Sequence, residues 1–197
     1  MGGSNTYPGL YRGSPSAMDK ALKIPGIDPL AKTASQETVL HCAAWGGSPS
    51  AMDKALKIPG IDPLAKTASQ QTVLHCAAWS GSPSAMDEAL KIPGIDPLAK
   101  TASQETVLHF AAWSGSPSAV MYLRICSKDF DLGLDPRILD NAGHDAFWYA
   151  GQSKNTEGVS AALRAPINIL RVEHSTKEAK EDDSEPEKFS NKRCAIM

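Results

Sequence analysis

Residues 38–71 read TVLHCAAWGGSPSAMDKALKIPGIDPLAKTASQQ, and nearly the same 34 residues return from Thr72 to Glu105. A further copy of TVLH starts at Thr106, and the second half of the unit already stands at residues 13–36. A unit of this length that recurs in phase is typical of solenoid proteins, in which neighbouring copies stack and bury a continuous core. The repetition therefore indicates a repeat array before any single residue is considered.

Each unit predicts two helices. The first covers TVLHCAAW, where leucine and the alanine pair form a narrow apolar stripe and a nearby glycine ends the helix. The second covers SPSAMDKALK, which begins with proline at the first helical position and stops at Pro59 and Gly60. The remaining segment, IDPLAKTASQ, is rich in turn-forming residues and leads to the next unit. One such unit cannot bury its apolar face alone, whereas a stack can.

The unit resembles the ankyrin repeat, whose pattern is T-P-L-H-x-A-A, a glycine, a second helix ending in leucines, and then G-A-D-x-N-A. Residues 38–44 match the first part, and residues 47–66 match the rest. Valine stands where the pattern has proline after threonine, and the hairpin glycine two residues before each threonine is replaced by glutamine, at Gln36, Gln70 and Gln104. Tetratricopeptide repeats share the 34-residue length, but their Trp, Leu-Gly and Tyr pattern is absent. The resemblance implies an all-α, ankyrin-like solenoid with short, irregular hairpin loops.

The same pattern divides the chain into three parts. We expect a flexible N-terminus at 1–12, the repeat array at 13–165 and a charged tail at 166–197. Within the array, the expected units are a half repeat at 13–37, repeats at 38–71, 72–105 and 106–140, and a divergent cap at 141–165. The half repeat leaves one apolar face open, so we expect either a preceding region or a partner to cover it.

The divergent cap is recognised from NAGHDAFWYA at residues 141–150, which resembles a first helix with the hairpin glycine restored at Gly143. Residues 157–163 predict its second helix. Residues 127–139 are expected to form a longer loop before the cap, with about five extra residues relative to the repeat period.

Composition is ordinary for a soluble globular protein, with 42% hydrophobic and 21% charged residues and a formal net charge of −2. Charge alone therefore gives no strong attraction to nucleic acid or anionic lipid. No run of eighteen apolar residues could span a bilayer, and the N-terminus lacks the features of a secretory signal. Three of the four cysteines stand in apolar surroundings, which favours a reducing, intracellular location over a disulfide scaffold.

The tail carries a separate signal. Residues 173–193 hold seven acidic and five basic side chains and few apolar ones, which predicts disorder. The chain ends in Cys194, Ala195, Ile196 and Met197, which resembles the CaaX box of prenylated proteins, and a final methionine implies farnesyl. The resemblance implies a protein prenyltransferase as a partner, a lipid anchor on Cys194, and a place on the cytosolic face of a membrane in a eukaryotic cell.

One isoprenoid gives only weak, reversible membrane binding, so a second signal is expected. The residues around Gly2 fit the loose N-myristoylation pattern, although a Gly-Gly-Ser start is equally typical of a flexible lead.

Motifs for catalysis are missing from the sequence, since it has no glycine-rich phosphate loop, HExxH pair, CxxC pair or GxSxG elbow. His41, His75 and His109 recur at the repeat period, but stacked helices lie about 8–10 Å apart, too far for three imidazoles to share a metal. The ankyrin resemblance implies a structural role for this histidine, with a hydrogen bond between units. We therefore expect no enzyme, cofactor, metal or small-molecule substrate.

Trp45, Trp79 and Trp113 end the first helices of successive units. The resemblance implies that this position borders the concave surface, where partner proteins dock. Three aromatic side chains in line fit a binding hot spot. They fit equally well a ladder in which each ring packs against the next, and the sequence leaves both interpretations open.

The sequence thus predicts an adaptor or scaffold that binds a partner protein and is tethered to a membrane by farnesylation. An alternative is a bacterial effector acting inside a host cell, because the layout resembles ankyrin effectors that intracellular bacteria inject. A less favoured alternative is an enzyme with a site in the divergent unit at 140–148, where His144 and Asp145 would be the reacting groups.

Overall fold

The computed structural model describes residues 28–129 and 133–165, and within these residues it contains eight helices and no strands. The predicted all-α repeat fold is confirmed. The expected flexible N-terminus, residues 13–27 of the half repeat, and the tail at 166–197 lie outside the described residues. The helices are α2 (Val39–Trp45), α3 (Pro49–Leu56), α4 (Val73–Ser80), α5 (Pro83–Leu90), α6 (Val107–Ser114), α7 (Pro117–Asp129), α8 (Ala146–Gln152) and α9 (Thr156–Arg164).

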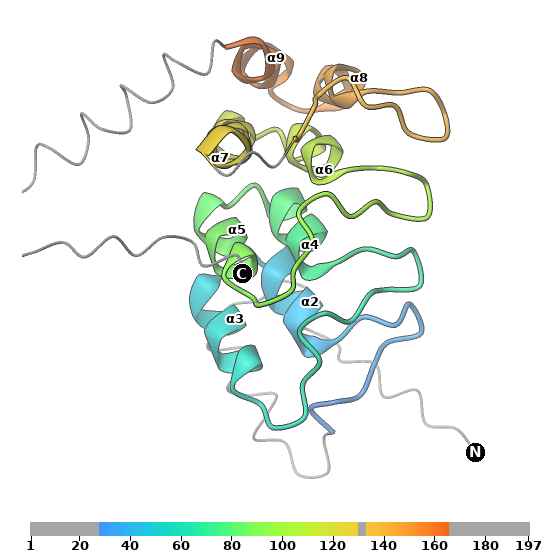
Figure 1. The fold of residues 1–197 in the computed structure, drawn as a ribbon, viewed down its shortest axis with the longest axis vertical. Helices are drawn as coiled ribbons and strands as arrows, with labels where there is room; N and C mark the ends of the chain where they lie inside the picture. The colour runs from blue at the N-terminus through green and yellow to red at the C-terminus, as the bar shows by residue number, and fades with distance from the viewer. Residues whose placement is uncertain (1–27, 130–132, 166–197) are drawn as a thin grey trace, which may run out of the picture.

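The helices form two parallel columns (Figure 1). Helices α2, α4, α6 and α8 pack on one another in chain order and make up what we call the inner column. Helices α3, α5, α7 and α9 do the same in the outer column. Long loops project from the inner column on the side away from the outer column, and we call them the fingers. Each repeat thus contributes one helix to each column and one finger.

Local signals in the sequence set the outer-column helix starts. The hydroxyl of Ser48 accepts a hydrogen bond from the backbone of Ala51 at 3.3 Å, with proline at the first helical position. The same cap recurs at α5. Gly81 ends α4 in the left-handed conformation at φ 72°, and a Cβ there would stand 2.9 Å from Ser116 of the next repeat. Glycine is required at this point both by the backbone and by the close approach of the neighbour.

The core runs continuously through the stack. The leucine and the paired alanines of α2, α4 and α6 are completely buried, as are the methionines of α3 and α5. Burying a leucine or methionine side chain contributes about 1.5–3 kcal/mol. The paired alanines add little apolar area themselves, but their small size lets successive inner helices approach closely. The buried residues that repeat in this way are Leu40, Leu74, Leu108, Met52, Met86, Ala43, Ala44, Ala77, Ala78, Ala111 and Ala112.

The fingers contain the strained positions of the fold. Gln36, Gln70 and Gln104 have φ of 61°, 62° and 63°, which is the left-handed region that favours glycine. Each of these residues closes a turn, and the backbone N–H of Gln70 donates to the carbonyl of Thr67 at 2.9 Å. Gly143 takes the same place in the cap, at φ 80°. The irregular hairpin predicted from the missing glycine is therefore a glycine-type turn built with glutamine.

One prediction about the outer column was wrong in part. Residues 127–139 were expected to be loop, but α7 continues to Asp129 and is 13 residues long, against eight for α3 and α5. The reason lies in the sequence. The Pro-Gly pair that follows α3 and α5 is replaced in this repeat by Ser127 and Lys128, which do not break a helix and lie within α7.

The repeated histidines cap the inner helices. In α6 the Nδ1 atom of His109 accepts from the backbone N–H of Thr106 at 2.9 Å, and the hydroxyl of Thr106 lies 2.8 Å from the same atom. His41 and His75 make the corresponding contacts with Thr38 and Thr72. Since a backbone N–H can only donate, Nδ1 carries no proton, and these rings hold theirs on Nε2.

The third histidine also joins two units. The Nε2 atom of His109 lies 3.2 Å from the carbonyl oxygen of His144 in the cap, which matches the structural role implied by the resemblance. The Nε2 atoms of His41 and His75 have no hydrogen-bond partner within ordinary limits among the described residues. Burial lowers the pKa of both imidazoles to about 4, and the carbonyls of Gln71 and Glu105 oppose this shift only in part.

Replacing Gln70 with glycine is expected to stabilise the array by up to roughly 1 kcal/mol, because it removes the left-handed strain of a residue with a Cβ. The measurement is urea unfolding of the intact chain. The reciprocal variant Gly143→Gln should destabilise by a similar amount, since a Cβ there meets nothing within 4 Å and only the backbone cost remains. Equal stability of Gln70→Gly and the parent would contradict this interpretation.

Acid should destabilise the array through the buried histidines. Their pKa is about 4 when folded and about 6.5 when unfolded, so the unfolded chain binds more protons between these values. Stability is therefore full above about pH 6.5 and falls as the pH drops toward 4. At pH 5 the loss is about 2 kcal/mol for each of His41 and His75. Urea unfolding at pH 7 and pH 5 measures it.

The matched control for this prediction is the double variant His41→Gln and His75→Gln. Glutamine at this position keeps the reciprocal cap but does not titrate. Its loss of stability between pH 7 and pH 5 should be smaller by about 4 kcal/mol, and an unchanged pH dependence would show that other groups dominate.

Candidate interaction site

The three tryptophans form a stacked series along the inner column, which we call the aromatic ladder. The ring centroids of Trp45 and Trp79 are 6.0 Å apart with an interplanar angle of 13°, and those of Trp79 and Trp113 are 5.7 Å apart at 19°. Tyr149 of the cap continues the series, 5.4 Å from Trp113 in a tilted arrangement. Each such pair adds about 0.5–1.5 kcal/mol beyond its buried area.

Packing within the ladder does not hide it from solvent. Trp79 is 38% exposed and Trp113 is 42% exposed, whereas Trp45 is half-buried. The rings therefore hold one another in place and still present part of their surface outward. The two interpretations of the tryptophans are compatible: rigid packing between neighbours fixes the orientation of side chains that remain accessible to a partner.

A pocket of about 190 Å³ opens on the ladder where the third repeat meets its neighbours. Its aromatic walls are Trp79, Phe110, Trp113 and Tyr149, and Gln71, Glu105 and His109 complete the lining. These residues come from α4, α6 and α8 and from the bases of two fingers. The pocket is therefore made by the stack and belongs to no single repeat.

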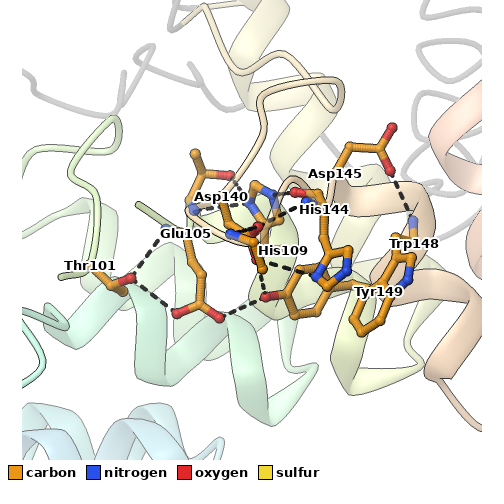
Figure 2. Close-up of polar contacts among 10 residues, drawn as sticks. Thr101, Glu105, His109, Asp140, His144, Asp145, Trp148 and Tyr149 are labelled. Carbon is orange, nitrogen blue, oxygen red and sulfur yellow. Dashed lines mark hydrogen bonds and ion pairs between the residues drawn. The ribbon is translucent and has the colours of Figure 1, made fainter. Parts of the chain in front are cut away.

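A polar network stands at one wall of this pocket (Figure 2). The hydroxyl of Tyr149 lies 2.9 Å from Oε1 of Glu105 and 2.7 Å from Oδ2 of Asp140. The other oxygen of Glu105 accepts from the hydroxyl of Thr101 at 3.0 Å. Two backbone N–H groups, of Ala142 and His144, donate to Asp140 at 2.8 Å. The cap is thus tied to the repeats that precede it through two carboxylates that share one phenol.

The environment shifts the pKa of both partners in this network. Burial raises the pKa of Tyr149 well above its ordinary value, and the two carboxylates raise it further. For Asp140, burial alone would raise the pKa, but the hydrogen bonds from Tyr149, His144 and Ala142 outweigh it and lower the pKa. Tyr149 is therefore a neutral donor and Asp140 an ionised acceptor.

His144 and Asp145, the reacting groups of the enzyme alternative, have structural contacts. The ring of His144 stacks on Trp148 with centroids 3.6 Å apart, and the carboxylate of Asp145 caps α8 through the backbone N–H of Trp148 at 2.9 Å. The buried thiols are poor nucleophiles, since burial raises the pKa of Cys42 to about 11 and that of Cys76 further still. Within residues 28–129 and 133–165, no cluster of histidine, cysteine, aspartate or glutamate could hold a metal ion.

The lipid-anchor residues predicted from the sequence, Cys194 with the rest of the CaaX box and Gly2, lie outside the described residues. In the described part of the chain, no helix is long and apolar enough to cross a membrane. Of the predicted site residues, the structure therefore brings together only the three tryptophans.

Sequence reasoning missed Glu105, Phe110 and Tyr149. The signal that could have found them is the departure from exact repetition. Phe110 stands where the two earlier units have cysteine, and Tyr149 takes that place in the cap. Glu105 repeats Glu37, so at that position the exception is Gln71, which also lines the pocket. All of these changes meet at one pocket.

Comparison with known families agrees with this architecture. Residues 40–134 match the family model of ankyrin repeats, in three copies, so the chain contains ankyrin repeats. No match is found among curated proteins. Ankyrin repeats imply a role in protein–protein interaction, and such domains are typically non-catalytic.

Removing the shared phenol should loosen the cap. Tyr149→Phe leaves Glu105 and Asp140 without their common donor, and we expect a loss of about 1–3 kcal/mol in unfolding free energy. Hydrogen exchange of the α8 and α9 amides should rise most. Tyr122→Phe is the matched control, because its hydroxyl donates to a single carboxylate, Asp87, which keeps Lys91 as an ion-pair partner. A larger effect at Tyr122 than at Tyr149 would contradict this account.

Proposed function

We propose that this protein is a non-enzymatic adaptor that binds a partner protein on the aromatic ladder and is held at a membrane by farnesyl on Cys194. The observation that supports the binding role most directly is the ladder itself. Trp79 and Trp113 are rigidly stacked and yet about two-fifths exposed. Large, pre-ordered aromatic side chains lose little entropy on binding and dominate the energy of many interfaces.

The tether rests on the sequence of the tail. A cysteine fourth from the end, two aliphatic residues and a terminal methionine form a farnesylation signal, and the charged segment before it favours access by a prenyltransferase. In this proposal the array determines which partner is bound, and the tail determines the location at the membrane. The two parts are separable and can be tested independently.

Binding is tested by affinity capture from cells with the intact chain and with a Trp45, Trp79 and Trp113 triple-alanine variant. Each tryptophan-to-alanine change can cost about 3–5 kcal/mol of stability. A second variant, Trp79→Phe with Trp113→Phe, therefore keeps an aromatic ring at each position and only replaces the two-ring indole with the smaller phenyl group. We expect both variants to lose the same proteins. Lys57→Ala on the outer column should keep them. Capture that is unchanged by the phenylalanine variant, with its fold intact by circular dichroism, would overturn the ladder as the docking face.

The tether is tested by expressing the chain in eukaryotic cells and measuring its mass by mass spectrometry. The parent should carry a farnesyl group and partition in part to membranes, and Cys194→Ser should be unmodified and cytosolic. Met197→Leu is the control, since a final leucine directs the longer geranylgeranyl chain. An unmodified parent, or a Cys194→Ser form that still sediments with membranes, would refute the anchor.

A further inference from the structure

The pocket on the aromatic ladder has a definite chemical character. Its lining combines the aromatic residues Trp79, Phe110, Trp113 and Tyr149 with one acidic residue, Glu105. Aromatic faces are electron-rich and attract cations, most strongly in the case of tryptophan. A carboxylate at the edge of such a pocket adds a full negative charge, so the combination favours a cationic group over a neutral or acidic one.

The negative charge in this pocket is only partly satisfied within the protein. Tyr149 has one hydroxyl hydrogen for two carboxylates, so at any moment it donates to either Glu105 or Asp140 (Figure 2). Each carboxylate oxygen has two lone pairs, and among the described residues Glu105 receives one donor at each oxygen. Asp140 also accepts two backbone N–H groups, whereas Glu105 has one threonine hydroxyl and a share of the Tyr149 phenol, so Glu105 is the less satisfied of the two and the one that lines the pocket.

The neighbouring histidine does not neutralise this charge. Burial lowers the pKa of His109, which keeps the ring neutral, and the charges that act on it most are the carboxylates of Asp140 and Glu105. One repeat earlier the balance is different, because Lys66 and Asp96 act on His75 in opposite directions. At the third repeat two carboxylates thus act on the histidine beside the pocket, whereas one repeat earlier a lysine opposes the aspartate.

We propose that this pocket receives an arginine side chain of the partner protein. The inference rests on the proposed function, since it takes for granted that a protein docks on the ladder. It adds the chemistry of the contact: a planar guanidinium packed against the tryptophan rings, with its N–H groups directed to Glu105.

Arginine fits this site better than lysine for two physical reasons. Its planar guanidinium stacks on aromatic rings and is more weakly hydrated than an ammonium group, so it loses less on leaving water. Its fork of N–H donors can also reach both oxygens of one carboxylate. An ammonium group carries the same charge but can neither stack nor bond in this way.

The chain itself supplies matched variants. Gln71 ends the first repeat at the position that Glu105 holds at the end of the second, with the same backbone bond to a threonine hydroxyl, 3.1 Å in each case. Glu105→Gln therefore removes the charge while keeping a side chain that the fold already accepts. Gln71→Glu adds a second carboxylate to the pocket lining. Glu88→Lys, which copies Lys54 of the first repeat on the outer column, is the control for net charge.

The test is titration of the intact chain with N-acetyl-arginine amide, followed by the indole N–H signals of Trp79 and Trp113 in NMR spectra. N-acetyl-citrulline amide, the neutral analogue of the same shape, and N-acetyl-lysine amide are the comparison probes. We expect saturable millimolar binding of the arginine probe, at least fivefold weaker in Glu105→Gln, stronger in Gln71→Glu and unchanged in Glu88→Lys. Binding should also weaken with added salt.

Three outcomes would overturn the assignment: equal shifts with citrulline, equal affinity for lysine, or no effect of Glu105→Gln in a variant whose spectrum shows an intact fold. These results are independent of the partner experiment. Loss of partner capture with the tryptophan variants, together with no arginine preference, would leave the docking face standing and remove only this pocket's specificity.

Discussion

Each unit of this array depends on its neighbours, because none of its helices can stand alone. Apart from α7, with its 13 residues, the helices of the three repeats are seven or eight residues long, well short of the roughly 12–15 residues at which an isolated helix becomes marginally stable in water. Their stability comes from burial between units, where leucine, methionine and paired alanines are completely enclosed. The stability of the whole array therefore depends on the interfaces between repeats. A change that weakens one interface destabilises both units that share it.

The constraint explains why strain and polar burial are tolerated. A glutamine held at positive φ and a histidine buried with its Nε2 atom unpartnered are each costly, yet both recur in exact copies of the unit. Their costs are offset by what the same residues position. The glutamine closes the finger turn, and the histidine satisfies the free N–H of the threonine that begins each inner helix. Because copies are nearly identical, each cost and each gain is repeated along the stack.

Function enters where the copies differ. The ladder of tryptophans is a product of repetition, since equivalent rings one period apart meet face to face. The pocket, in contrast, forms where the exact repetition of the unit ends. Phe110 and Tyr149 replace small thiols beside Glu105, and the finger that precedes the cap brings Asp140 to the phenol of Tyr149. A stack of exact copies would present one surface many times, whereas the junction with the cap makes one place unlike the others.

The sequence by itself determined the class of fold and most of its elements. The period, the proline and glycine signals and the apolar stripes placed both helices of every described repeat, because these signals act within a few residues along the chain. It failed at the end of α7, where a missing Pro-Gly stop let the helix run on. It also identified the tryptophans, but could not decide whether they pack or stay exposed.

Only the tertiary structure decided that the tryptophans pack on one another and also stay partly exposed. Only it revealed the contacts between Glu105, Tyr149 and Asp140. These residues lie 44 and 9 positions apart in the chain, and their meeting depends on how three inner helices stack and how the last finger folds back. The local sequence does not predict contacts of this kind. It is set by the distances between units, which exist only once the stack has formed.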